Sequence, residues 1–140
     1  MISFVVPGVP VAKGRPKLST RAGFARAYTP KKTRDYESVV RHEAQRIMAG
    51  RSPLDGPLEV SITFFLPIPA SWSRRRKQEA LSGTHWPTGR PDIDNLGKAV
   101  LDGLNAVVFA DDARIVDLHL AKAYAEQPHA FVEVNDWTNP

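Results

Sequence analysis

Residues 58–64 read Leu-Glu-Val-Ser-Ile-Thr-Phe, so apolar and polar side chains alternate over the whole stretch. Successive side chains of an extended chain point to opposite faces, and this alternation therefore predicts a half-buried β-strand. Pro67 and Pro69 end the strand because proline donates no hydrogen bond to a neighbouring strand. A strand of this kind belongs to a sheet that helices cover on one face.

The chain before this strand predicts a further strand and a helix. Residues 2–6 alternate in the same way and end at a Pro-Gly pair, which is typical of a turn. Thr29 suits the N-cap of a helix and Pro30 suits its first position. Apolar side chains at helical spacing over residues 36–48 give this helix a face that packs on a sheet. The intervening residues 13–29 are rich in Gly, Pro, Ser and basic residues and predict a long loop.

The chain after the central strand predicts an insert, a second helix and two more strands. Residues 67–90 are Pro-rich and basic, and we interpret them as an inserted segment with one short helix at 74–81. A helix from about residue 94 to 107 carries its apolar residues on one side. Two strands follow, at residues 115–123 and 131–134. The order β-α-β-(insert)-α-β-β predicts an α+β fold, a single domain over residues 1–140 in which two helices pack on a small mixed β-sheet.

Composition excludes several classes of protein. The chain has no cysteine, so neither disulfides nor thiolate metal sites hold it together, and carboxylates and imidazoles remain as possible metal ligands. No apolar run reaches the roughly 18 residues that a membrane span needs. The N-terminal segment has no basic leader and no long apolar stretch, so it predicts a strand rather than a signal peptide. We expect a cytoplasmic protein with no membrane partner.

The net charge of +4 is unevenly distributed. Residues 1–34 contain eight Lys or Arg and no acidic residue, whereas six of the fifteen acidic residues lie within residues 92–117. A basic flank beside an acidic centre suits an enzyme that holds a polyanion with one region and a metal ion with another. A solvated basic face accounts for the same pattern, so charge alone leaves nucleic-acid binding open.

Two acidic residues lie close together in the segment Arg90-Pro91-Asp92-Ile93-Asp94-Asn95-Leu96-Gly97-Lys98. If the chain is still extended at Asp92 and Asp94, both carboxylates point to the same side and can hold one hard cation such as Mg²⁺. Two simpler interpretations remain open. Asp94 can be the N-cap of the following helix, or Asp94, Lys98 and Asp102 can form a surface ladder of i, i+4 ion pairs.

A second acidic pair, Asp111-Asp112, follows an apolar run and precedes a predicted strand. Like charges this close repel each other unless water or a cation screens them. If the helix after Asp94 and the strand after Asp112 are neighbours, three carboxylates converge as in catalytic metal centres. Lys98 can face the same site and stabilise a phosphate in the transition state, or it can form an ordinary salt bridge with Asp94. We expect Asp102 to matter far less than the clustered acids.

Basic and aromatic side chains offer candidate contacts with nucleic acid. Lys13, Arg15 and Lys17 alternate, so in an extended loop all three face one way and can follow phosphates, although a solvated loop is equally consistent. A second basic run consists of Arg74, Arg75, Arg76 and Lys77. The tryptophans can stack on bases, but such residues more often fill the edge of a core. No two histidines have metal-ligand spacing, and we assign no histidine to a metal.

The segment at residues 90–98 and the Asp111-Asp112 pair together resemble the RusA family of Holliday junction resolvases. The family pattern is Asp-x-Asp-Asn-x-x-Lys, then a helix, then an Asp-Asp pair before a strand. It falls on Asp92, Asp94, Asn95, Lys98, Asp111 and Asp112. The opening Gly8-x-Pro10-x-x-Lys13-x-Arg15-Pro16 and the helix entry Tyr28-Thr29-Pro30 are similar to one branch of the family, many of them phage or prophage proteins.

The resemblance implies that Asp92, Asp94 and Asp112 are the catalytic, metal-binding acids. It also implies that Lys98 is the catalytic lysine and that Asn95 and Asp111 have supporting roles. It also implies Mg²⁺ as the cofactor, with Mn²⁺ as a substitute, a homodimer, and branched DNA as the partner. The implied function is paired phosphodiester hydrolysis that resolves four-way junctions in DNA recombination and repair. The alternatives are a non-catalytic nucleic-acid-binding module, whose acids are caps and solvated turns, and a nuclease acting on other branched DNA or on RNA.

Overall fold

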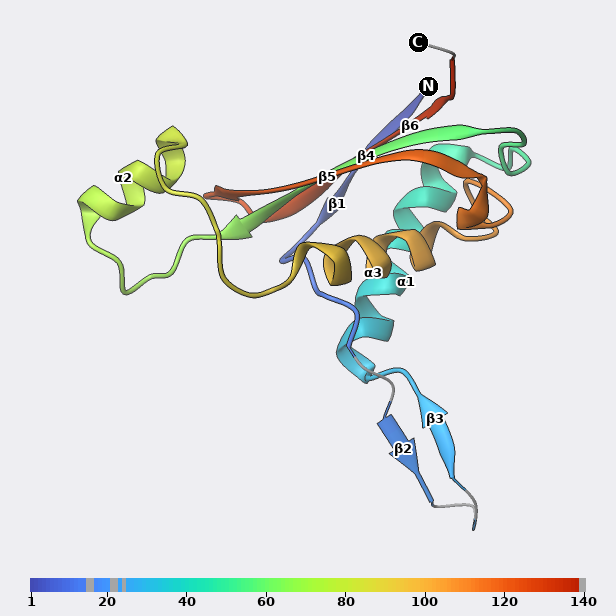
Figure 1. Ribbon diagram of the computed structural model, residues 1–140, viewed down its shortest axis with the longest axis horizontal. Helices are drawn as coiled ribbons and strands as arrows, with labels where there is room; N and C mark the ends of the chain where they lie inside the picture. Colours follow the sequence, from blue (N-terminus) through green and yellow to red (C-terminus); the bar gives the residue numbers. More distant parts are fainter. Residues whose placement is uncertain (15–16, 21–22, 24, 139–140) are drawn as a thin grey trace.

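The computed structural model describes residues 1–14, 17–20, 23 and 25–138. Four strands form the main sheet in the spatial order β1-β6-β4-β5 (Figure 1). Their bounds are β1 Ile2–Pro7, β4 Leu58–Pro67, β5 Ile115–Ala125 and β6 His129–Asp136. β6 is antiparallel to β1 and to β4, whereas β4 and β5 are parallel. The sheet is therefore mixed, and the α+β fold class predicted from the sequence is confirmed.

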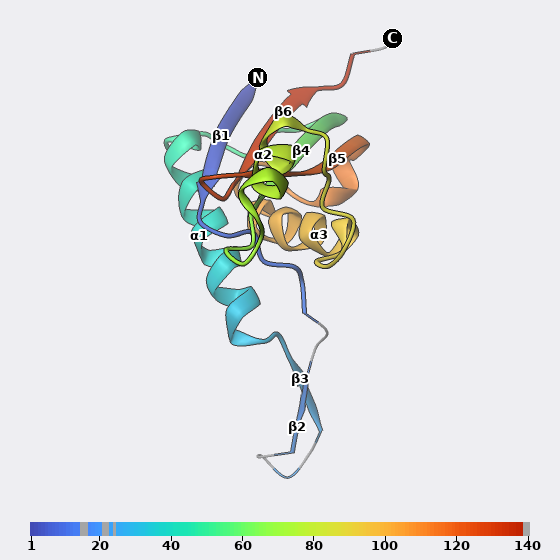
Figure 2. The same ribbon diagram turned by 90° about the vertical axis from the view of Figure 1, so that its left-hand side faces the viewer.

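Two long helices, α1 (Lys31–Met48) and α3 (Ile93–Leu104), cover one face of this sheet (Figure 1, Figure 2). Alternate residues of β4 are buried against them, and the residues between are half-buried on the opposite face. On α1 the buried residues recur at helical spacing, as expected: Thr33, Tyr36, Val40, Ala44 and Met48. The apolar stripe of each helix thus packs on the apolar face of the sheet.

Two glycines of α3 allow this helix to approach its neighbours closely. A Cβ at Gly103 would lie 2.7 Å from Cγ1 of Val40 in α1, and a Cβ at Gly97 would lie 2.7 Å from Cδ1 of Leu120 in β5. Carbon atoms in ordinary contact are about 3.5–4.0 Å apart. The two missing side chains therefore let α3 sit between α1 and β5.

Arg41 of α1 fixes the C-terminal end of α3. Its guanidinium donates to the carbonyl oxygens of Asn105, at 3.2 Å, and Asp102, at 3.3 Å. These carbonyls have no partner within the helix, and a cation complements the negative end of the helix dipole. The helix ends three residues earlier than the expected Val107, because the backbone of Asn105 is extended.

The segment predicted as a long loop contains a short hairpin. β2 (Lys17–Ser19) pairs with β3 (Arg26–Tyr28), and the hairpin extends away from the sheet and helices (Figure 1, Figure 2). The expectation of an unstructured loop was therefore wrong for these two strands. The start of α1 also differs by one residue, since Pro30 is the N-cap and Lys31 the first helical residue.

The segment at residues 67–90 contains the predicted short helix, α2 (Arg74–Ser82). Ser73 caps it by accepting a hydrogen bond from the Arg76 backbone N–H at 3.2 Å. The ring of Trp72 packs edge-to-face against Tyr124, at 5.3 Å between centroids, and joins α2 to the end of β5. None of the helices in the described ranges is long and apolar enough to cross a membrane.

Candidate active site

The first two acids of the predicted motif lie at the start of α3. Asp92 is the N-cap residue, with an extended backbone, but its side chain makes no capping hydrogen bond. Asp94 lies in the first turn, where its Oδ1 accepts a hydrogen bond from the Asn95 backbone N–H at 2.8 Å. Both carboxylates are exposed. The positive end of the helix dipole favours negative charge at this point.

This geometry corrects two interpretations of the pair. The N-cap residue is Asp92, so the assignment of that position to Asp94 was wrong. Because α3 begins at Ile93, the residues from Asp92 to Asp94 are not a continuous extended stretch, and strand alternation does not align the two carboxylates. Within the described ranges the Asp92 carboxylate has no hydrogen bond or ion pair, which leaves its oxygens available for a ligand.

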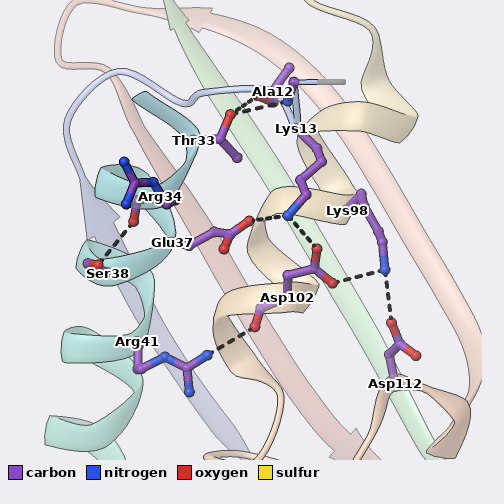
Figure 3. A network of polar contacts seen from close by, with 11 residues as sticks. Ala12, Lys13, Thr33, Arg34, Glu37, Ser38, Arg41, Lys98, Asp102 and Asp112 are labelled. Atoms are coloured by element: carbon purple, nitrogen blue, oxygen red, sulfur yellow. Dashed lines mark hydrogen bonds and ion pairs between the residues drawn. The ribbon is translucent and has the colours of Figure 1, made fainter. Parts of the chain in front are cut away.

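Lys98 connects α3 with the second acidic pair. Its Nζ lies 2.9 Å from Oδ1 of Asp102 and 3.7 Å from Oδ2 of Asp112 (Figure 3). Asp112 begins the short 3-10 helix Asp112–Arg114, directly before β5, and the exposed Asp111 is its N-cap. The helix after Asp94 and the turn before β5 are therefore neighbours, and the expected alternative of a Lys98–Asp94 salt bridge is absent from the described structure.

Asp102 lies at the centre of a chain of ion pairs. Its Oδ2 is 3.1 Å from Nζ of Lys13, which also lies 2.6 Å from Oε1 of Glu37 in α1 (Figure 3). The side chains of Asp102, Lys13 and Glu37 are all only about 20% exposed, at 19%, 22% and 20%. The sequence placed Asp102 in a surface stripe, whereas the structure places it in the contact between two helices.

Mutual contacts hold Lys13, Lys98 and Asp102 in their charged forms. Burial disfavours the charged ammonium of Lys13, but hydrogen bonds with Glu37 and Asp102 outweigh burial and raise its pKa above 10.5. The hydrogen bond with Asp102 raises the pKa of Lys98 as well. Burial alone would raise the pKa of Asp102, yet the hydrogen bonds from the two lysines lower it below 3.8. The site therefore combines stable positive charge with carboxylates.

The three acids expected to bind metal offer only oxygen donors. Asp92 and Asp94 are exposed and Asp112 is half-buried. In the described part of the chain their donor atoms do not form a group in which all lie within 4.8 Å of one another. Hard divalent cations take carboxylate oxygens and water and often use only one or two carboxylates. The carboxylate oxygens of these acids thus fit a divalent cation. Such a cation needs only one or two of the three carboxylates at a time.

A second group of possible metal ligands, which the sequence did not indicate, lies on the sheet. Glu59, Asp117 and His119 offer ligand atoms that all lie within 4.8 Å of one another, and His119 Nε2 is 3.0 Å from Asp117 Oδ1. Glu59 and Asp117 are partners in the β4–β5 register, on the face that the helices leave uncovered. This register is a property of the folded sheet, so no spacing in the sequence could reveal the group.

A cleft of about 740 Å³ lies beside Asp92. Its walls come from residues 9–12 and Gly14, from the start of α1, and from residues 90–92 together with Asn95. Lys32 and Arg90 add positive charge, and prolines and valines form the apolar part. A cleft of this composition, with the exposed carboxylate of Asp92 in its wall, has room and charge for a nucleic-acid strand.

The basic residues predicted to contact DNA are placed in different ways. Lys13 is committed to Glu37 and Asp102, so its side chain does not follow the hairpin. Arg15 and the side chain of Lys17 lie outside the described residues. The four cations of the second run occupy the first turn of α2, which lies beyond the end of the sheet where β4 ends and away from the hairpin (Figure 1).

Two of the cations on α2 have partners of their own. Arg75 pairs with Glu79 at 3.2 Å, and the guanidinium of Arg76 lies 3.9 Å from the ring centre of Trp72. Trp72 is thus occupied by protein packing, which favours the core-edge interpretation over base stacking. Trp86, in contrast, is 57% exposed.

Acidic side chains beside a lysine, at the edge of a small α+β fold, are typical of metal-assisted hydrolases of phosphodiesters. The comparisons with known proteins agree with this class. Residues 7–135 match the family described as endodeoxyribonuclease RusA. The chain therefore belongs to the RusA family of endodeoxyribonucleases, as the sequence motif predicted.

Two relatives illustrate the range of the family. The chain is 34% identical over 142 residues to the uncharacterized protein YqaN of Bacillus subtilis (strain 168), and the match covers 96% of each chain. It is 32% identical over 81 residues to the crossover junction endodeoxyribonuclease rusA of Lactococcus phage r1t. That second match covers 57% of this chain and 55% of the phage protein.

Proposed function

We propose that this chain is a divalent-metal-dependent endonuclease that resolves four-way DNA junctions. The observation that supports it best is the contact of Lys98 with Asp112, 3.7 Å apart, because it joins the two halves of the family motif at one place. The nuclease family and the crossover junction activity in the name of the phage relative support the same substrate.

The proposed reaction is hydrolysis of a phosphodiester. One or two at a time of Asp92, Asp94 and Asp112 would hold Mg²⁺, or Mn²⁺ in its place, which when bound supplies an activated water and neutralises phosphate charge. Lys98 has donors left after its pair with Asp102, since an ammonium has three, and it would stabilise the charge that develops on the phosphate. Asn95 and Asp111, both exposed beside these acids, would have supporting roles.

Binding would use positive charge outside the acidic centre. The cleft beside Asp92 would take one strand, with Lys32 and Arg90 at its walls. The hairpin and the basic turn of α2 would contact the backbone of further arms of the junction. In a symmetric homodimer two such sites would face two strands, which is what paired nicks require.

Cleavage of a synthetic four-way junction tests the proposal. The protein should nick the junction with Mg²⁺ and leave it intact with EDTA. Plain duplex, flap and RNA substrates of the same sequence separate a resolvase from a nuclease with a different preference. A protein that binds the junction but produces no nick with any divalent cation would instead be a binding module.

A further inference from the structure

Among the residues that the structure describes, Asp102 is the carboxylate near the site that contacts two ammonium groups. Its Oδ1 lies 2.9 Å from Nζ of Lys98, and its Oδ2 lies 3.1 Å from Nζ of Lys13. The side chain of Asp102 is 19% exposed, so water competes weakly for these contacts. Each oxygen thus fixes one lysine, and the Asp102 carboxylate lies between the two ammonium groups (Figure 3).

Lys13 is held at both its backbone and its side chain. The backbone N–H donates to the carbonyl oxygen of Asn95 in the first turn of α3, at 2.8 Å. The Nζ bridges Glu37 of α1 and Asp102 of α3. The sequence predicted that Lys13 follows phosphates from an extended loop, with a solvated loop as the alternative, whereas its contacts fix it between α1 and α3.

The segment around Lys13 is anchored by a buried hydroxyl. Oγ1 of Thr33, whose residue is 2% exposed, accepts from the Gly14 backbone N–H at 3.1 Å and donates to the carbonyl oxygen of Ala12 at 3.3 Å. These contacts fix the chain on either side of Lys13 against α1. The ammonium of Lys13 therefore has a defined place rather than the many rotamers of an exposed lysine.

We propose that Asp102 is a positioning residue that holds Lys98 and Lys13 together as a pair of cations facing the scissile phosphate. This inference rests on the proposed nuclease function, which it deepens by adding Lys13 to the phosphate-binding groups. Lys98 and Lys13 each retain a donor beyond their carboxylate partners, and one phosphate oxygen can accept from each. This role for Asp102 differs from the prediction made from the sequence, which was that Asp102 matters far less than the clustered acids.

The first test is the variant Asp102→Asn, which keeps the shape of the side chain and removes its charge. On a four-way junction with Mg²⁺, kcat should fall by about ten- to a hundredfold, as when an orienting partner is lost, while KM changes little. In a Lys98→Ala background the same substitution should cause a smaller further loss of kcat, because only Lys13 is then left for Asp102 to position. Asp35→Asn is the matched control, since Asp35 pairs with Lys31 on the exposed side of α1, and it should leave kcat unchanged.

The second test needs no substrate. Side-chain NMR relaxation of lysine ε-carbons should show Lys13 and Lys98 ordered in the wild-type protein, and both more mobile in Asp102→Asn. Glu37→Gln should loosen Lys13 alone. Unchanged order of both lysines in Asp102→Asn, or a fall in thermal stability with unchanged kcat, would overturn the positioning role. A wild-type protein that cleaves no junction would end the proposed function instead, and the relaxation data would still decide whether Asp102 holds the lysines.

Discussion

Replacing Gly103 by alanine adds one methyl group at the contact between α1 and α3, and so tests how closely the two helices must approach. In Gly103→Ala the new Cβ would lie 2.7 Å from Cγ1 and 2.8 Å from Cβ of Val40, and 3.1 Å from the carbonyl oxygen of Glu37. A β-branched side chain and a backbone oxygen cannot turn away, so the helices would have to separate. An extra methyl group in a packed core costs about 1–3 kcal/mol, and the higher helix propensity of alanine offsets about 1 kcal/mol of this. Since three atoms crowd the new Cβ, we expect the cost at the upper end of this range and a net loss of about 2 kcal/mol in the free energy of unfolding.

Urea unfolding of wild-type protein, Gly103→Ala and Gly97→Ala measures this difference. Gly97 is the matched control because its Cβ would meet chiefly the tip of the Leu120 side chain, at 2.7 Å. Leu120 is only partly buried and can change rotamer. At Gly97 the gain in helix propensity and the cost of packing the extra methyl group should therefore nearly cancel. A Gly103→Ala protein as stable as wild type, or more stable than Gly97→Ala, would refute the argument that the helix contact is closed to a side chain.

Three further predictions concern the site. Asp92→Asn or Asp112→Asn should abolish junction cleavage and leave junction binding measurable by gel shift; loss of both together would indicate misfolding. The free energy of unfolding should fall as the pH drops below about 4, since the stabilisation from the lowered pKa of Asp102 is complete above its ordinary value of 3.8 and is lost as the pH falls through the lowered value; Asp102→Asn should flatten this fall. Arg74→Ala should reduce the slope of log K against log salt by about one if that side chain contacts a phosphate, and an unchanged slope would remove α2 from the binding surface.

The positions of most helices and strands could be predicted because periodicity is local. Alternation over residues 58–64 gave β4, and helical spacing over residues 36–48 gave the buried face of α1. The hairpin was missed because β2 and β3 have three residues each, too few to show a period of two. The ends of α3 shifted because Asn105 leaves the helix where Arg41 takes over its terminal carbonyls, a tertiary contact.

The group formed by Glu59, Asp117 and His119 shows where sequence reasoning stops. Asp117 and His119 are two residues apart on one strand, so their shared face could be read from the alternation. Their neighbour Glu59 depends on the parallel pairing of β4 with β5 and on a register shift between Leu58 and Glu59. A shift by one residue would place Glu59 opposite Val116 or Leu118 and away from the group, and the alternation of the local sequence does not specify the register.

The ion-pair partner of Lys98 in the candidate active site also depends on tertiary contacts that the local sequence does not specify. Asp94 and Asp102 are both four residues from Lys98, and the isolated helix favours the acid that lies N-terminal to the lysine. The structure selects Asp102 instead, at 2.9 Å. Asp94 is exposed in the first turn, where water weakens any ion pair, whereas Asp102 is largely buried and already beside Lys13. Since Lys13 reaches this point only through contacts with α1 and with Asn95, the fold decides which acid orients Lys98 and leaves Asp94 free for a ligand.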